Sequence, residues 1–138
     1  MASVDVYRGG CLCGAIRYTV SGPLLSTNVC YCTQCQRQTG APLPAFLTVP
    51  AAQLRLEQGK PASYRASPRA EREFCAGCGT CLFWREDGSR NVDVFLGAID
   101  EPGRVPKPEF AIWTAHRVPW LPELEGVASH RGARREPE

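Results

Sequence analysis

Residues 74–84, FCAGCGTCLFW, hold the pattern that decides the fold: a Cys-x-x-Cys turn, formed by Cys75 and Cys78, runs directly into a strand-like segment. Gly79 permits the positive φ that such a turn often needs, and the backbone amides of the turn can point at the two sulfurs. Paired thiolates of this kind are typical ligands of Zn²⁺ in tetrahedral sites. A redox pair would instead expect a helix that starts at the first cysteine. The pattern therefore favours metal binding over redox chemistry.

A second complete pair lies near the start of the chain, where Cys11 and Cys13 are flanked by glycines in GGCLCG. Joined to the pair at Cys75 and Cys78, it predicts a closed site of four thiolates, which is the usual composition of a structural zinc site. Such a site would tie the first strand to a strand in the middle of the chain. The binding free energy of the metal would then become folding free energy.

The remaining group is Cys30, Cys32 and Cys35, in the segment CYCTQC. Three protein ligands with an open fourth position, taken by water or substrate, are the usual arrangement of a catalytic zinc. Two alternatives for a fourth protein ligand stay open. Cys81 could close the site, although it could equally be a small apolar residue of a buried strand. His116 could be the fourth ligand or an acid or base, or it could be a packed or surface histidine with no such role.

The rest of the chain predicts a single all-β domain made of short strands. Ile16, Tyr18 and Val20 alternate with polar residues, which is the pattern of a half-buried strand. The segment EDGS at residues 86–89 predicts a hairpin turn, and the residues after Cys32 predict one or two helical turns. Further strands are expected at residues 44–50, 62–67, 70–74, 80–84 and 92–99, within a zinc-binding domain at 1–124 that is followed by a flexible tail at 125–138.

Composition narrows the function classes. The net charge of +2 and the short basic cluster near the C-terminus argue against binding of nucleic acid. No segment has the roughly 20 apolar residues that span a bilayer, and the N-terminus does not have the pattern of a secretory signal. We therefore expect a cytoplasmic protein, in which thiols stay reduced, and the 8 cysteines then favour metal over disulfides.

With its cysteines in this order, the sequence resembles the family of glutathione-dependent formaldehyde-activating enzymes and centromere protein V. The matching segments cover most of residues 8–121; they are GGCLCGAIRYTVSGP, CYCTQCQRQTGAP, REFCAGCGTCLFW, VDVFLGAID and IWTAHRVPWL. The resemblance implies a small all-β fold of folded antiparallel sheets with two zinc ions. The structural zinc would be held by Cys11, Cys13, Cys75 and Cys78, and the catalytic-type zinc by Cys30, Cys32 and Cys35. Family members commonly carry another residue where this chain has Cys81.

The activity that the resemblance implies is a carbon–sulfur lyase reaction, the condensation of formaldehyde, or another small aldehyde, with glutathione. Zinc held by the three cysteines could take the sulfur of the thiol as its fourth ligand and keep it ionised. Arg37, which follows the three cysteines, is a candidate partner of a glutathione carboxylate. Trp84, Trp113, Trp120 and Phe46 are candidates for an apolar wall, although aromatic residues on short strands are more often core.

Two other function classes fit the same cysteines. One is a non-catalytic binding module with two closed four-cysteine sites. The other is a thiol or zinc redox sensor whose three-cysteine group oxidises or loses its metal.

Overall fold

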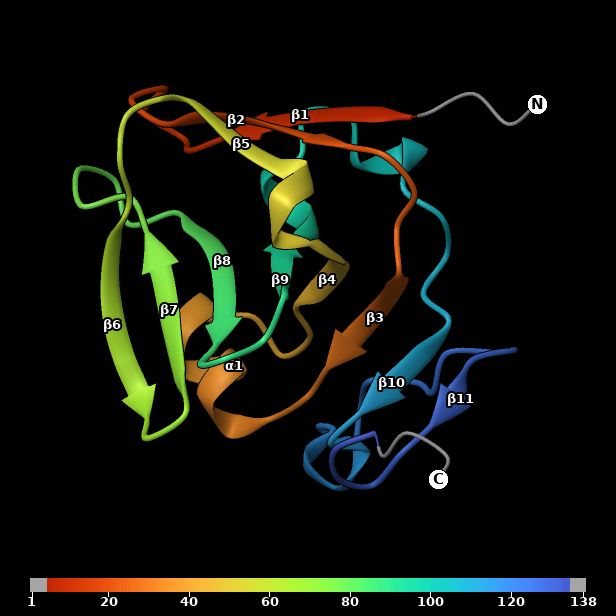
Figure 1. Ribbon diagram of the computed structural model, residues 1–138. Helices are drawn as coiled ribbons and strands as arrows, with labels where there is room; N and C mark the ends of the chain where they lie inside the picture. Colours follow the sequence, from red (N-terminus) through yellow and green to blue (C-terminus); the bar gives the residue numbers. More distant parts are fainter. Residues whose placement is uncertain (1–4, 135–138) are drawn as a thin grey trace.

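The structure, a computed structural model, describes residues 5–134 and contains two antiparallel-rich sheets and one short α-helix within that range (Figure 1). The strands are β1 (Val6–Gly10), β2 (Arg17–Ser21), β3 (Ser26–Cys30), β4 (Ala45–Pro50), β5 (Leu54–Gln58), β6 (Ala62–Ser67), β7 (Ala70–Phe74), β8 (Cys81–Glu86), β9 (Asn91–Phe95), β10 (Phe110–Ile112) and β11 (Ala128–Ser129). The helix is α1 (Thr33–Thr39), and 3₁₀ turns occur at Ala51–Gln53, Leu96–Ala98, Pro102–Arg104 and Thr114–His116. The expected all-β fold is confirmed.

The two sheets enclose the main core. The smaller sheet has the strand order β1-β2-β5 and the larger one the order β11-β10-β3-β4-β9-β8-β7-β6. Ile16, directly before β2, and the alternating residues Tyr18 and Val20 within it are all buried, as the sequence pattern predicts. They pack against apolar residues of the larger sheet, among them Leu47 and Val94. Burial of these side chains is the main source of the stability that holds the sheets together.

The opposite face of the larger sheet is different in character, because strand residues alternate between the two faces. In β4, Leu47 and Val49 enter the main core, whereas Phe46 packs in a separate cluster with Phe95 and the cysteines of the second group. The register aligns Thr48 with Asp93, Asp93 with Trp84, and Trp84 with Arg72. A row of mostly polar residues therefore crosses the centre of the sheet on the face turned away from the main core.

Most of the predicted strands are present, and their ends differ by a few residues. The predicted segments at 62–67 and 70–74 coincide with β6 and β7, and the predicted hairpin turn joins β8 to β9. The predicted strand at 92–99 is shorter, because β9 ends at Phe95 and a 3₁₀ turn follows. The strands β1, β3, β5, β10 and β11 were not expected. In β3 the segment STNVC gives no apolar alternation because Thr27 and Asn28 are buried polar residues.

The last described residues are connected to the larger sheet. Strand β11 pairs in parallel with β10, which itself pairs in parallel with β3. The backbone amides of Trp113 and Thr114 donate to the carbonyls of Gly132 and His130, at 2.9 and 3.0 Å. The boundary at residue 124 and the flexibility of the tail stay predictions, and the last residues of that segment, 135–138, lie outside the described range. Within residues 5–134, no helix has the length and apolar character needed to cross a membrane.

Candidate metal centres and cavity

The first group of cysteines comes together across the interface of the two sheets. The sulfurs of Cys11, Cys13, Cys75 and Cys78 all lie within 4.8 Å of one another. Two of the separations are 3.6 Å, between Cys11 and Cys13, and 3.8 Å, between Cys13 and Cys75. A tetrahedron of sulfurs around Zn²⁺ with bonds of about 2.3 Å has edges of about 3.8 Å. The four side chains therefore fit a tetrahedral metal site.

The local backbone holds these four sulfurs in place. Gly79 has a φ of +79°, as the sequence predicts, and its amide donates to the carbonyl of Cys75 at 2.7 Å. The amide of Ile16 donates to the sulfur of Cys11 at 3.2 Å, and the hydroxyl of Thr80 lies 3.2 Å from the sulfur of Cys78. Strand β8 rather than a helix follows the turn, which agrees with the interpretation as a metal pair.

The second group lies where β3 passes into α1. Cys30 ends β3, Cys32 is the N-cap of α1, and Cys35 is in its first turn. The three sulfurs lie within 4.8 Å of one another, and among the residues at 5–134 no fourth His, Cys, Asp or Glu joins them. The amide of Cys35 donates to the sulfur of Cys32 at 3.3 Å. We call these three residues the cysteine triad.

The electrostatics of the triad favour a bound cation. Hydrogen bonds from Cys30 and Cys35 lower the pKa of the Cys32 thiol to about 2, whereas the neighbouring thiols and burial raise the pKa of Cys30 well above its ordinary value. The three thiols therefore cannot all ionise together unless a positive charge is bound among them. A divalent ion such as Zn²⁺ would supply that charge, and sulfur ligands suit it.

A buried guanidinium stands next to the triad. Arg72 on β7 is only 4% exposed, and its Nη2 lies 3.5 Å from the sulfur of Cys35. Its Nη1 donates to the side-chain oxygen of Gln38 at 2.8 Å, while its Nε has no acceptor among the described groups. Arg72 forms no ion pair with a described carboxylate. The sulfur of Cys35 is therefore the group beside it that could become its anionic partner, once that thiol is ionised.

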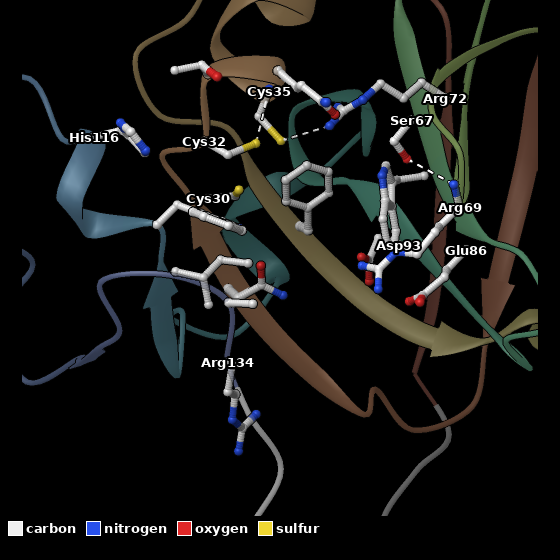
Figure 2. Close-up of a pocket in the computed structure, with 18 of the residues that line it drawn as sticks. Cys30, Cys32, Cys35, Ser67, Arg69, Arg72, Glu86, Asp93, His116 and Arg134 are labelled. Carbon is white, nitrogen blue, oxygen red and sulfur yellow. Dashed lines mark hydrogen bonds between the residues drawn. The ribbon is translucent and has the colours of Figure 1, made fainter.

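The triad opens into a cavity of about 760 Å³ on the outer face of the larger sheet (Figure 2). This volume is in the range of sites for small organic ligands. Phe46 and Ile112 form an apolar floor beside the sulfurs, and Trp113 and His116 lie on one side of them. Arg72 stands on the other side, and beyond it the cavity continues toward Arg69, Glu86 and Asp93, while Arg134 lies at a separate edge (Figure 2).

Some of the residues that the sequence predicted for the site line the cavity, and others do not. Phe46, Trp84 and Trp113 line the cavity, whereas Trp120 is 74% exposed and does not. Arg37 lies on the exposed side of α1 and is not among the cavity residues, so its pairing with a carboxylate stays a prediction.

The two candidate fourth ligands do not join the triad either. His116 lines the cavity but is not part of the sulfur group. Cys81 packs beside the triad, and its thiol donates to the carbonyl of Gln38 at 3.7 Å. Burial raises the pKa of the Cys81 thiol, which favours the protonated form of a packed side chain.

Sequence reasoning missed the charged residues of the cavity, namely Arg69, Arg72, Glu86, Asp93 and Arg134. A weak signal was present, since Asp93 is the single charged residue of the strand segment VDVF, and Arg72 lies between two acidic residues in AEREF. A charged residue on a central strand is unusual unless it has a partner, but the sequence does not say which strands lie beside it.

Asp93 gives a prediction for stability. Burial, together with neighbouring Glu86, raises the pKa of its carboxyl to about 6 although the hydroxyl of Thr48 donates to it. Because the folded pKa is above the unfolded value, the folded state keeps a proton between about pH 4 and 6 that the unfolded chain loses, and stability falls as pH rises through this window. We expect Asp93→Asn, which keeps the bond from Thr48, to raise the free energy of unfolding at pH 8 by as much as about 3 kcal/mol.

The measurement is denaturant unfolding of both proteins at pH 5 and pH 8. The cysteine groups are the same in the two proteins, so the difference between them isolates Asp93. Asp5→Asn, at an exposed position, is the control and should change neither value. A variant that is less stable than the parent at pH 8 would contradict the prediction.

Comparison with known proteins identifies the family of the chain. A family model described as glutathione-dependent formaldehyde-activating enzyme matches residues 6–116. An uncharacterized lyase of Schizosaccharomyces pombe is 35% identical over 89 residues, which cover 62% of this chain and 61% of that protein. The chain thus spans less than two thirds of the length of this curated relative.

Among solved structures, the crystal structure of a Rhodobacter sphaeroides protein superposes with a TM-score of 0.57 at 25% sequence identity. The match covers 67% of this chain and 87% of that one. The family match extends over all three cysteine groups and over the strands that carry the cavity, from β1 to the 3₁₀ turn at His116. The chain belongs to the family of glutathione-dependent formaldehyde-activating enzymes.

Proposed function

We propose that the protein is a zinc-dependent, lyase-type enzyme that joins a thiol, with glutathione as the first candidate, to formaldehyde or another small aldehyde. The observation that carries the proposal is a triad of sulfurs on the wall of a ligand-sized cavity, with no fourth side-chain ligand among the described residues. The family and the name of the lyase relative support the same class of reaction.

We assign two zinc ions to the chain, one to each cysteine group. The ion held by Cys11, Cys13, Cys75 and Cys78 would be coordinatively saturated and structural. An ion held by Cys30, Cys32 and Cys35 would supply Lewis acidity that keeps a fourth, exogenous sulfur ligand ionised near neutral pH.

The chemical step forms one carbon–sulfur bond. The thiolate sulfur attacks the carbonyl carbon, the carbon–oxygen π bond breaks, and the proton that the thiol lost ends on the new hydroxyl group, so that the product is the sum of the two substrates. Both reactants would lie in the cavity against Phe46 and Ile112. Binding them side by side would convert an encounter of two molecules into a step within one complex.

Two side chains of this cavity have defined tasks in the proposal. Arg72 balances the negative charge that three or four thiolates accumulate, since its Nη2 is already beside the sulfur of Cys35. His116 lies on the cavity wall near the triad (Figure 2), and we assign to its imidazole the return of the proton to the aldehyde oxygen.

Cobalt(II) substitution tests the proposal. We expect the d–d and thiolate charge-transfer bands of the dicobalt protein to change when glutathione is added, because the triad gains a fourth sulfur. The control is S-methylglutathione, which has no ionisable sulfur and should leave the bands unchanged. Bands that show two sites with four sulfurs each before any thiol is added, and that do not respond to glutathione, would favour the closed binding module instead.

A further inference from the structure

The cavity has a second end that the proposed chemistry does not use. It lies on the far side of Arg72 from His116 and is formed by the loop Ser67–Arg69 together with Trp84, Glu86 and Asp93 (Figure 2). We call these residues the distal end. Ser26, which shares the cross-strand row of Thr48 and Asp93, is four residues from Cys30 along β3, or about 13 Å. The backbone of Asp93 is therefore offset from that of Cys30 by about this length along the strands, and the side chain of Arg72, from the same row, extends back to the triad.

The distal end presents two carboxylates and an indole. Asp93 lies opposite Trp84 in the sheet register, and Glu86 is two residues further along β8 on the same face. The partner of the Asp93 carboxylate is the Thr48 hydroxyl, and neither acid forms an ion pair with a cation of the described chain. Two unneutralised carboxylates beside an aromatic face match an ammonium group.

The same end presents one cation. Arg69 lines the cavity, and its guanidinium has no carboxylate partner within the described range. Its backbone is held from both sides: its amide donates to the hydroxyl of Ser67 at 3.3 Å, and its carbonyl accepts from the amide of Asp87 at 2.7 Å.

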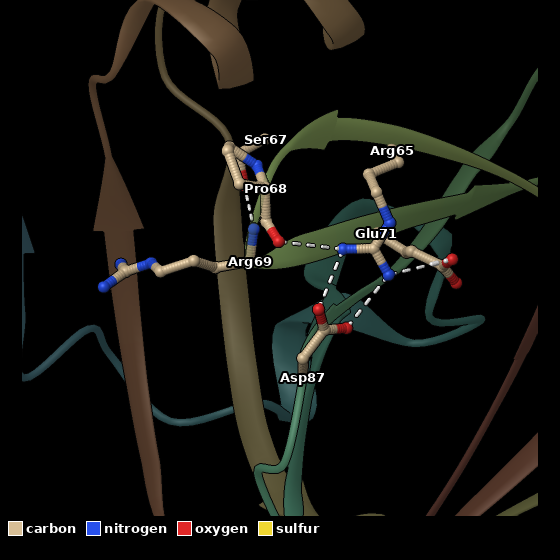
Figure 3. A network of polar contacts seen from close by, with 6 residues as sticks. All are labelled: Arg65, Ser67, Pro68, Arg69, Glu71 and Asp87. Atoms are coloured by element: carbon tan, nitrogen blue, oxygen red, sulfur yellow. Dashed lines mark hydrogen bonds and ion pairs between the residues drawn. The ribbon is translucent and has the colours of Figure 1, made fainter.

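A network of ion pairs fixes this loop. Arg65 donates to both carboxylate oxygens of Asp87, at 2.8 and 3.0 Å, to Glu71 at 3.2 Å and to the carbonyl of Pro68 at 3.3 Å. The side chain of Arg69 extends away from this network (Figure 3). The loop therefore fixes the backbone of Arg69, so that only its side chain has to be ordered when an anion binds.

We propose that the distal end binds a free α-amino-acid group of the thiol substrate, with its ammonium on Asp93 and Glu86 and its carboxylate on Arg69. This inference rests on the proposed function, because it takes the sulfur of the same molecule to lie at the triad. The separation from the triad suits a thiol whose amino-acid group is several bonds from sulfur, as in a γ-glutamyl peptide. Free cysteine does not suit this separation, because a single methylene group joins its sulfur to the carbon that bears the ammonium and the carboxylate.

The test is calorimetric titration of the zinc-loaded full chain with three probes. Glutathione carries both the sulfur and the amino-acid group, glutaryl-cysteinylglycine has no α-amino group, and S-methylglutathione has a blocked sulfur. We expect the loss of the amino group to weaken binding by about tenfold or more, in line with the loss of one charged hydrogen-bonding partner. S-Methylglutathione should bind more weakly than glutathione but still depend on Asp93.

Variants assign the effect to the distal end. Asp93→Asn should weaken the binding of glutathione by about tenfold and leave glutaryl-cysteinylglycine unchanged, because the latter has no ammonium to lose. Arg69→Gln should weaken all three probes, since each retains the carboxylate. The matched controls are Asp5→Asn and Arg55→Gln, which remove the same charges at exposed positions away from the cavity.

The outcomes separate the two proposals. If glutaryl-cysteinylglycine binds as tightly as glutathione, or if Asp93→Asn weakens both equally, the amino-acid site is overturned while the enzyme proposal stands. If S-methylglutathione binds as tightly as glutathione and both depend on Asp93, the distal site stands and the placement of sulfur at the triad is overturned.

Discussion

Replacing Cys75 by serine is expected to unfold the domain. Cys75 is 3% exposed, belongs to the main core, and is one of the four sulfurs that connect the two sheets. Binding of a structural zinc is worth about 10–16 kcal/mol in small domains, which matches or exceeds the roughly 5–15 kcal/mol that separate folded from unfolded domains of this size. The loss of one ligand therefore removes most of the stability.

The measurement is near-UV circular dichroism during denaturant unfolding, with metal analysis of the same samples. We expect no cooperative transition for Cys75→Ser and a zinc content lower by about one ion per chain. Cys81→Ser is the matched control, because Cys81 is partly buried nearby but belongs to neither sulfur group. It should keep its zinc and lose on the order of 1–2 kcal/mol. A folded Cys75→Ser protein with full metal content would show that this site is not structural.

Replacing Cys32 by serine is expected to abolish activity while the fold survives. Cys32 is the N-cap of α1, and its sulfur accepts from the amide of Cys35. Serine is among the preferred N-cap residues, so its hydroxyl can take over that hydrogen bond. The serine hydroxyl does not replace a thiolate as a zinc ligand, however, and the triad loses its metal.

We expect Cys32→Ser to lower kcat/KM for the thiol and the aldehyde by at least about 1,000-fold, which corresponds to about 4 kcal/mol of transition-state stabilisation. Its unfolding transition should stay cooperative, with a midpoint near that of the parent, and metal analysis should find one zinc fewer. The result is informative because both serine variants lose one metal but only one of them unfolds. If Cys32→Ser unfolds as Cys75→Ser does, the division into a structural and a catalytic centre is wrong.

The closeness of the sulfurs within each short cysteine motif could be predicted from spacing alone. A Cys-x-x-Cys turn and the Cys-x-Cys pair each bring two sulfurs together through short backbone segments, and the triad is contained in six residues. The structure places these groups as expected, with Cys11 and Cys13 beside Cys75 and Cys78. Alternation of apolar residues likewise identified β2, because burial on one face leaves a period of two in the sequence.

The cavity could not be predicted in the same way. Arg72, Trp84, Asp93 and Thr48 come from four strands, and they form one row only because β7, β8, β9 and β4 are neighbours in this register. A shift of one residue in any of these pairings would turn the side chains of that strand to the other face. The parallel pairing of β10 with β3, which brings Trp113 and His116 to the triad, also joins segments about 80 residues apart.

The sequence by itself determined which sulfurs lie together within each cysteine pair and within the triad, because ligands separated by one or two residues are confined together whatever the rest of the chain does. The tertiary structure joined the two distant pairs into one group of four sulfurs and decided which side chains face the triad. Strand order and register bring a buried arginine to the sulfur of Cys35 and two carboxylates and an arginine to the distal end. Burial then changes the chemistry of these groups, as it does for the carboxyl of Asp93, and burial is a property of the packed sheet rather than of any short segment.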